Sequence, residues 1–357
     1  MTYTADTCVL VVDPAHPDPS AVAQAASVLR RGGLVAFPTE TVYGLGAHAL
    51  DAAAVRRVFA AKGRPATDPL IVHLASAGQV AEVAAGLPPA AGELARRLWP
   101  GPLTLVLRRH PRVPPEVAVG RDTVAVRVPA HPVALALIAA AAVPVVAPSA
   151  NLFSRPSPTT AQHVLEDLRG RVDVVLDAGP TAIGIESTVV DLTVDPPALL
   201  RPGGIPAEEL RALLPGLSYT PRYLSAGEGG GAAAPAPGML LKHYSPRAAL
   251  TLYAGERDAA LARMRDDALR LAREGRSVGV MTADEDAAAF AGVPVRLALL
   301  GPAADQAQLA ARLFAAMREL DAAGAGAILA RAPERSGIGL AIWDQLVRAA
   351  EGRVVEV

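Results

Sequence analysis

The sequence predicts an α/β protein with two domains. Its 357 residues are more than twice the roughly 150 of a typical domain. Hydrophobic residues make up 51% of the chain and aromatic residues only 4%, which predicts a packed core of small side chains and excludes disorder throughout. Apolar runs of strand length alternate with helical patterns on both sides of residues 225–238, a segment of Gly, Ala and Pro with almost no large side chain to bury.

In the first series, strand follows strand several times without a helix between them, which favours a mixed sheet. Helix starts are expected at Ser20, Asp51 and Thr159, whose side chains can accept from free backbone N–H groups. Residues 133–147 are too short for a membrane span of about 20 residues and are interrupted by Pro144, so they predict a buried helix and then a buried strand. Strands are predicted at residues 8–12, 34–37, 71–74, 103–107, 124–128, 145–147, 172–176 and 188–192.

The second series alternates more regularly, which predicts a small parallel α/β domain. Residues 253–257, which follow the first strand of this domain, do not form a glycine-rich phosphate loop. We therefore assign this domain no nucleotide site. The predicted division is a domain over 1–215, a linker over 216–247 and a domain over 248–357. The expected elements are strands at 250–253, 278–281, 295–299, 327–330 and 354–357, a helix ending at Arg273, and helices at 306–322 and 338–350.

Charge and cysteine content restrict the function classes. Lys+Arg number 34 and Asp+Glu 35, so no positive excess is available for non-specific nucleic-acid binding, and such a role would need a local basic cavity. Cys8 is the single cysteine, which excludes an intrachain disulfide and a multi-cysteine zinc site and fits a reducing compartment. Residues 1–12 show no targeting segment, so we expect a cytoplasmic protein.

Several polar residues stand where ligands are commonly bound. Lys62 and Arg64 lie in an irregular turn after a predicted helix, where two cations can hold an anion or only complement the helix dipole. Ser149 and Asn151 follow an apolar strand, a usual ligand position in α/β sheets, although both types also end strands through local bonds. Ser157 precedes a predicted helix whose free N–H groups suit phosphate oxygens.

Further candidates lie within strands or at their margins. Arg127 falls in an alternating strand and would need an anionic partner if it faces the core, and Ser187 and Arg201 lie at strand margins, where a purely structural role also remains open. The glycines of residues 44–49 match a dinucleotide fingerprint only in part, so we predict a turn there that directs Thr39, Glu40, Thr41 and Tyr43 into a cleft.

The motifs point to chemistry between bound substrates. The seven histidines have no metal-ligand spacing, and the sequence contains neither a Walker loop nor a serine nucleophile elbow. Cations, hydroxyls and an amide without a nucleophile indicate a site that positions anionic substrates so that they react with each other. We expect the cations to gather in one cavity and the acidic residues to lie elsewhere.

Eight short motifs, in this order, resemble the YrdC-like superfamily. They are FPTETVYGLG (37–46), KGR (62–64), DPLIVH (68–73), WPGPLT (99–104), PSAN (148–151), SPT (157–159), ESTVVD (186–191) and RPG (201–203). The segment PGMLLKHYSP (237–246) and the second domain resemble the two-domain members, the threonylcarbamoyl-AMP synthases. The resemblance implies a YrdC-like mixed, twisted sheet domain followed by a smaller Rossmann-like parallel α/β domain.

The resemblance also implies a reaction. A nucleotidyltransferase of this family forms L-threonylcarbamoyladenylate and pyrophosphate from threonine, bicarbonate and ATP, with Mg²⁺ accompanying the ATP and no metal site on the protein. Downstream tRNA-modification proteins accept the adenylate and modify the adenosine beside the anticodon. Neither stable nucleic-acid binding nor membrane attachment is expected.

Matching positions imply roles for individual residues. The cations would stabilise charge on the departing pyrophosphate, with Lys62 and Arg64 as the catalytic pair and no covalent enzyme intermediate. His243 and Tyr244 would form a lid over the site. Threonine would be surrounded by Thr41, His73, Arg127, Ser187 and the backbone of Ala147, and ATP by Lys62, Arg64, Asp68, Thr123, Ser149, Asn151, Ser157 and Arg201.

Two positions depart from the family pattern. Asp68 replaces a frequent Asn, and its carboxylate would repel phosphate unless it faces magnesium or Lys62. Ser154 replaces a frequent Gly, which predicts a differently shaped turn after Asn151.

Two alternatives to the synthase function stay open. One is a carbamoyltransferase of the same superfamily, whose zinc-finger form the single cysteine excludes. The other is a non-catalytic RNA-binding or regulatory protein.

Overall fold

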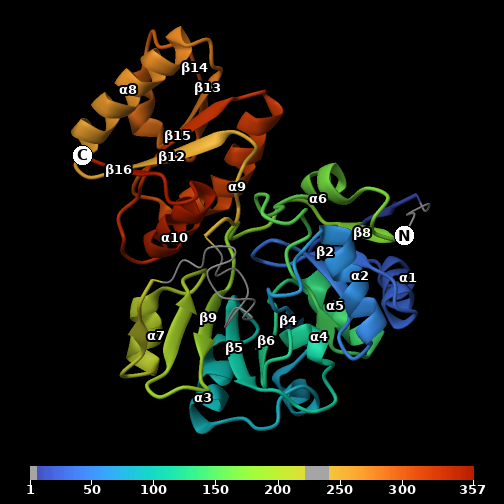
Figure 1. Ribbon diagram of the computed structural model, residues 1–357. Coiled ribbons are helices and arrows are strands. Elements are labelled where there is room, and N and C mark those ends of the chain that lie inside the picture. The colour runs from blue at the N-terminus through green and yellow to red at the C-terminus, as the bar shows by residue number, and fades with distance from the viewer. Residues whose placement is uncertain (1–5, 222–240) are drawn as a thin grey trace.

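The computed structural model describes residues 6–221 and 241–357. These residues form two α/β units, each built around one sheet, with the second unit at the top of Figure 1 in orange and red. Part of the predicted linker, residues 222–240, lies outside the described residues. Within the predicted linker range, Ser218–Tyr219 form strand β11, which extends the first sheet.

The first unit contains a mixed sheet, as the sequence predicts. Within residues 6–221 the strand order is β1-β8-β2-β3-β7-β4-β6-β5-β9-β10-β11. The sheet combines antiparallel pairs, such as β2 with β3 and β5 with β6, with parallel pairs, such as β4 with β6. The strands are β1 (Cys8–Val11), β2 (Val35–Pro38), β3 (Tyr43–His48), β4 (Ile71–His73), β5 (Leu103–Arg108), β6 (Thr123–Arg127), β7 (Val145–Val146), β8 (Val174–Asp177), β9 (Thr188–Asp191) and β10 (Ala198–Arg201).

The helices of this unit begin close to the predicted starts. Asp51 caps its helix as predicted, whereas the other two caps are each displaced by one or two residues. The first helix is capped by Asp18 and not by Ser20, because the Asp18 carboxylate accepts from the Ser20 N–H at 2.6 Å. The helix expected at Thr159 is capped instead by Thr160, because the Thr160 hydroxyl accepts from the His163 N–H. The helices are α1 (Pro19–Arg30), α2 (Ala52–Lys62), η1 (Ala77–Glu82), α3 (Pro89–Leu98), α4 (Pro115–Ala118), α5 (Pro132–Ala141), α6 (Ala161–Leu168) and α7 (Ala207–Leu213).

The predicted turn at residues 44–49 is wrong, because residues 44–48 belong to strand β3. The chain turns earlier, at residues 39–42, where the Thr39 N–H donates to the Val42 carbonyl. The glycines serve close packing instead of a turn. A Cβ on Gly46 would lie 2.8 Å from the Phe37 ring, and one on Gly44 would lie 3.1 Å from Ala147 Cβ.

The second unit is a parallel sheet with helices, also as predicted. Its strand order is β14-β13-β15-β12-β16, and every pair is parallel. The observed bounds lie within one or two residues of the predicted ones. The elements are β12 (Ala249–Ala254), α8 (Arg257–Arg273), β13 (Val278–Thr282), η2 (Asp284–Phe290), β14 (Val295–Leu299), α9 (Gln306–Ala322), β15 (Ala327–Arg331), α10 (Gly339–Ala349) and β16 (Val354–Glu356).

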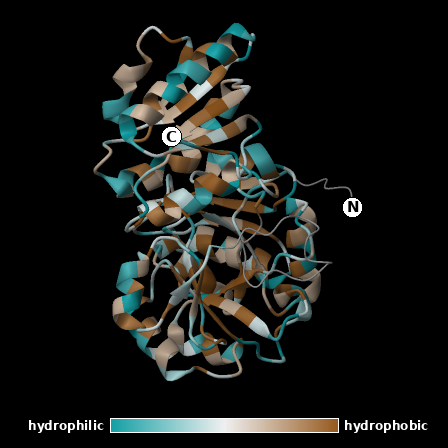
Figure 2. Cartoon of the chain, turned by 60° about the vertical axis from the view of Figure 1, so that its left-hand side comes forward, coloured by the Kyte–Doolittle hydropathy of each residue, from teal (hydrophilic) through white to brown (hydrophobic). Residues whose placement is uncertain are grey.

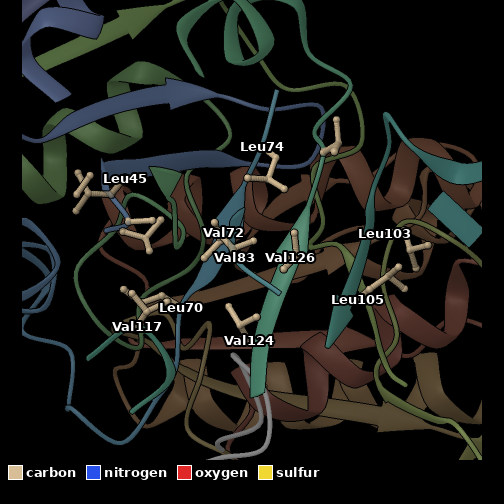
Figure 3. Packing of buried hydrophobic residues seen from close by; sticks show 14 of the residues in the cluster. Leu45, Leu70, Val72, Leu74, Val83, Leu103, Leu105, Val117, Val124 and Val126 are labelled. Carbon is tan, nitrogen blue, oxygen red and sulfur yellow. The ribbon is translucent and has the colours of Figure 1, made fainter. Parts of the chain in front are cut away.

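Small apolar side chains fill the cores of both units. In the first unit, Leu45, Val72, Leu105 and Val126 from neighbouring strands meet on one face of the sheet (Figure 3). Hydrophobic residues gather on the strands of both sheets, and hydrophilic ones on the outer helices (Figure 2). No helix within residues 6–221 and 241–357 has the length and apolar character of a membrane span.

The two units share a packed boundary along helix α9. Val42 and Ile185 of the first unit belong to the same buried cluster as Phe314 of α9. Gly184 approaches so closely that an added Cβ would lie 2.4 Å from the Ala311 Cα. Helix α9 therefore packs directly against the loops beside β3 and β9.

Candidate active site

A cavity lies where several strands of the first sheet end. His73, Arg127 and Arg201 are the last residues of β4, β6 and β10, and Ser187 directly precedes β9. Strand ends are common ligand positions in α/β sheets. The lining residues are Thr39, Thr41, Val42, Gly44, Arg64, Ile71, His73, Arg127, Ala147, Pro148, Ser149, Glu186, Ser187, Arg201 and His243.

Most of the residues that the sequence singled out meet at this cavity. The lining includes all five assigned to threonine, together with Arg64, Ser149, Arg201 and the lid residue His243. Among the described residues, the lining does not include Lys62, Asp68, Thr123, Asn151, Ser157 or Tyr244.

Arg127 has the anionic partner that its buried position requires. Its Nη2 lies 2.7 Å from the Glu40 Oε1, and both side chains are buried or nearly so. Its Nη1 donates to the Thr41 hydroxyl at 3.0 Å, and its Nε donates to the Gly101 carbonyl at 3.2 Å. These bonds hold the guanidinium at the cavity wall, where it can receive a carboxylate.

Arg201 and Ser187 form a second polar group at the cavity. The Arg201 guanidinium donates to the Ser187 carbonyl at 2.9 Å and to its hydroxyl at 3.0 Å. Thr104, whose Oγ1 lies 2.8 Å from the Ser187 Oγ, was missed from the sequence although it ends the motif at 99–104. Glu186 lies 3.9 Å from Arg201 and accepts from the Ser157 hydroxyl at 2.7 Å.

The sequence suggested magnesium or Lys62 as the partner of the Asp68 carboxylate, and the structure shows an ion pair with Arg64. The carboxylate forms this buried ion pair at 2.8 Å and lies 4.0 Å from the His243 Nε2. Arg64 also donates to the backbone carbonyls of Asp68 and Pro69. The guanidinium therefore offsets the carboxylate charge beside the cavity.

Lys62 is directed to a neighbouring loop, and the expectation that it faces the cavity is wrong for this arrangement. Its Nζ donates to the backbone carbonyl of Ser149 and, at 2.7 Å, to that of Asn151. The Asn151 amide in turn donates to the carbonyls of Leu152 and Arg155, at 2.7 and 2.9 Å. Lys62 thus fixes the loop that presents Ser149, and its direct contact with ATP stays a prediction.

Thr123 lies far from the cavity. It begins strand β6, opposite Arg108, whereas Arg127 ends the same strand at the cavity. Four residues of strand span roughly 13 Å. Its assignment to ATP stays a prediction that this geometry does not favour.

Both histidines at the cavity are neutral near pH 7. Burial, followed by the nearby Arg127 guanidinium, lowers the pKa of His73 to about 3. Burial, followed by Arg64, lowers the pKa of His243 well below its usual value. These imidazoles can accept or donate a hydrogen bond without adding positive charge.

The segment after residue 240 closes one side of the site. The Tyr244 ring contacts the His243 ring edge-on, with centroids 4.2 Å apart, and stacks against Phe314 of α9 at 5.1 Å. The Ser245 N–H donates to the Ser154 carbonyl at 2.6 Å. Ser154 has a φ of 66°, so it adopts the left-handed conformation that favours the family's glycine.

Three guanidinium groups and several hydroxyls therefore surround one cavity. Among the described residues, no group of three or more His, Cys, Asp and Glu side chains is placed to hold a metal ion. The arrangement suits two anionic ligands that approach each other, one near Arg127 and one near Arg64 and Arg201.

Comparisons with known proteins identify relatives along nearly the whole chain. Residues 205–351 match the family model "Threonylcarbamoyl-AMP synthase, C-terminal domain", and residues 27–203 match the one described as "Telomere recombination". The chain is 44% identical to the threonylcarbamoyl-AMP synthase of Pyrococcus abyssi, over 93% of this chain and 95% of the relative, and 42% identical to that of Bacillus subtilis, over 97% of each.

Solved structures give the same result. The crystal structure of Pyrococcus abyssi Sua5 complexed with L-threonine has a TM-score of 0.91 and 42% identity to this chain, and the match covers 98% of this chain and 100% of that one. These matches span both units, and the fold agrees with that of the solved relative. The chain therefore belongs to the threonylcarbamoyl-AMP synthase family.

Proposed function

We propose that this protein is an L-threonylcarbamoyladenylate synthase, a nucleotidyltransferase that converts threonine, bicarbonate and ATP into threonylcarbamoyl-AMP and pyrophosphate. The observation that carries the proposal is the cavity itself, where Arg64, Arg127 and Arg201 meet the hydroxyls of Thr41 and Ser187. Family membership and the threonine-bound relative support the choice of substrate.

Threonine fits the part of the cavity around Arg127. We assign its carboxylate to the Arg127 guanidinium and its polar groups to Thr41, Ser187 and the backbone of Ala147. The neutral His73 would accept or donate a hydrogen bond there. The short hydroxyl side chains around Arg127 favour a small polar substrate at this place.

ATP fits the part around Arg64 and Arg201. We assign the triphosphate to these guanidinium groups and to Ser149 at the cavity, with Asn151 and Ser157 on the same loop beside it. Lys62 would act through this loop, because its ammonium holds the backbone of Ser149 and Asn151.

The reaction then depends on how the substrates are positioned and on how the developing charge is stabilised. The threonine amine and bicarbonate condense to a carbamate and water, and a carbamate oxygen attacks the α-phosphorus of ATP. The bond from that phosphorus to the pyrophosphate oxygen breaks, and Arg64 and Arg201 stabilise the charge that develops on pyrophosphate. The enzyme forms no covalent bond with either substrate in this mechanism.

Magnesium would enter as part of the ATP complex. The carboxylates nearest the cavity already have cationic or hydroxyl partners, Glu40 with Arg127 and Glu186 with Ser157. Phosphate oxygens are therefore the better ligands, and the ion would supply charge neutralisation on the triphosphate.

His243 and Tyr244 would act as a lid that keeps water from the mixed anhydride product. A solved variant of the Pyrococcus abyssi protein has an adjacent histidine and tyrosine replaced by alanine. We further propose that proteins of tRNA modification accept the product, and that the protein acts in the cytoplasm, where tRNA is modified.

The test is pyrophosphate release by the purified protein with ATP, threonine and bicarbonate. We expect release that depends on both threonine and bicarbonate, with threonylcarbamoyl-AMP detected by mass spectrometry. Release that is equal without threonine contradicts the proposal. Activity with carbamoyl phosphate alone would favour a carbamoyltransferase, and salt-sensitive RNA binding without turnover would favour a regulatory protein.

A further inference from the structure

We propose that Arg318, in helix α9 of the second unit, is a positioning residue for the ATP part of the active site. The proposal rests on the proposed function, which assigns ATP to the loop of residues 149–157. Arg318 is only 4% exposed, and it reaches across the boundary between the two units. A buried guanidinium is stable only when its partners offset the cost of removing it from water.

Two groups of the first unit share one nitrogen of Arg318. Its Nη2 donates to the Pro156 carbonyl at 2.6 Å and to the Asp167 Oδ2 at 2.8 Å. Its Nη1 lies 3.6 Å from the Glu166 Oε2. The side chain of Asp167 is fully buried, so this ion pair is screened little by solvent.

Asp167 connects Arg318 to the other end of the same loop. The oxygen that accepts from Arg318 also accepts from the Leu152 N–H at 3.3 Å, and the second oxygen pairs with Arg155. Leu152 follows Asn151, and Pro156 precedes Ser157. One guanidinium thus holds the loop next to Asn151 and Ser157, two of the residues that we assign to ATP.

The loop depends on these bonds for its position. Residues 151–157 belong to neither a helix nor a strand, so side chains supply most of its fixed points. A displacement of about 1 Å in such a loop can cost on the order of a hundredfold in rate. The threonine part is held differently, because Arg127 is fixed by Glu40, Thr41 and the Gly101 carbonyl. Loss of Arg318 should therefore affect ATP and threonine unequally.

The test compares Arg318→Met and Arg318→Lys with the wild-type full chain. The matched control is Arg312→Met, which removes an exposed arginine of the same helix whose ion pair, within residues 6–221 and 241–357, is with the exposed Glu319. Calorimetry measures the Kd of ATP and of threonine separately, and thermal unfolding measures stability. For Arg318→Met we expect ATP binding to weaken on the order of tenfold, with threonine binding within about twofold of wild type.

The two remaining variants complete the expected pattern. Arg318→Lys should fall between wild type and Arg318→Met, because an ammonium can serve one of the two acceptors. The control Arg312→Met should bind both ligands as the wild type does. If Arg318→Met does not fold, Asp167→Asn takes its place, because it weakens the same connection and keeps an acceptor for the Leu152 N–H.

Some outcomes would overturn the proposal. Unchanged ATP binding in folded Arg318→Met, or an equal loss of ATP and threonine binding, would mean that Arg318 contributes only to stability. A wild-type protein that binds no ATP would refute this proposal too. A wild-type protein that binds ATP and threonine but releases no pyrophosphate would instead refute the proposed reaction and leave the Arg318 comparison valid.

Discussion

At the scale of the residue, Lys62 shows how burial changes the role of a cation. It is only 2% exposed, and its ammonium bonds to a loop. Burial first, and the Arg64 guanidinium second, lower its pKa to about 7. An unfolded lysine has a pKa near 10.4, so between about pH 7 and pH 10 the unfolded chain binds more protons at this position than the folded protein does.

This difference predicts the pH dependence of stability. The free energy of unfolding should rise with pH across that window, on the order of 1 kcal/mol per pH unit from Lys62 alone. Lys62→Met, which has no titrating group, should lack this contribution. Chemical denaturation of both proteins at pH 7, 8 and 9 would measure it. A constant difference between the two proteins would contradict the burial argument.

The buried ion pair of Arg64 and Asp68 links turnover to stability. Arg64→Ala removes the guanidinium that pairs with a buried carboxylate, so we expect loss of turnover together with about 3–5 kcal/mol of stability. Arg64→Ala combined with Asp68→Asn should recover part of the stability, because the buried charge is gone, but none of the turnover. Denaturation and pyrophosphate assays distinguish the two effects. Recovered turnover in the double variant would remove Arg64 from the catalytic set.

At the scale of the element, the sequence predicted most strands and helices but not the β2–β3 hairpin. The helix at Gln306–Ala322 has the predicted bounds, because its apolar spacing is local and regular. In β3, two glycines break the apolar pattern that marks a strand. These positions require glycine because they lie in close contact with Phe37 and Ala147, which are elsewhere in the chain. No local pattern carries that information.

The lid segment combines a strained backbone with a packed ring. Tyr244 has a φ of 59° and is fully buried, and its hydroxyl has no hydrogen-bond partner among the described residues. Tyr244→Phe should therefore keep both stability and synthesis close to wild type. Tyr244→Ala should lose the contacts with His243 and Phe314 and raise the ratio of ATP hydrolysed to product formed. Chromatography of AMP and threonylcarbamoyl-AMP measures this ratio. Equal ratios in Tyr244→Ala and wild type would show that the ring does not restrict water.

At the scale of the whole molecule, the balanced net charge conceals a local arrangement of both signs. The sequence predicted that four cations meet in one cavity, and Arg64, Arg127 and Arg201 line it, whereas Lys62 does not. The expectation that acidic residues lie elsewhere is wrong, because Glu40, Asp68 and Glu186 lie beside these arginines. Arg127 and Glu40 are 87 positions apart and pair only because the fold brings their segments together, whereas Arg64 and Asp68 are four positions apart in one loop. Motif order indicated the members of the site, and the fold determines which of them touch.

The boundary between the units includes a close contact at Gly184. Gly184 has a φ of 74°, its N–H donates to the Thr41 carbonyl at 3.0 Å, and a Cβ would meet the backbone of Ala311. Gly184→Ala should push α9 from the first unit and disturb Thr41, so threonine should no longer raise the unfolding temperature as it does in the wild type. Gly170→Ala is the control, because Gly170 has a φ of 75° but nothing within 4 Å of an added Cβ. Both variants carry the same backbone strain, and only Gly184→Ala carries the clash. If scanning calorimetry with and without threonine gives the same result for both, the contact between the units does not shape the threonine site.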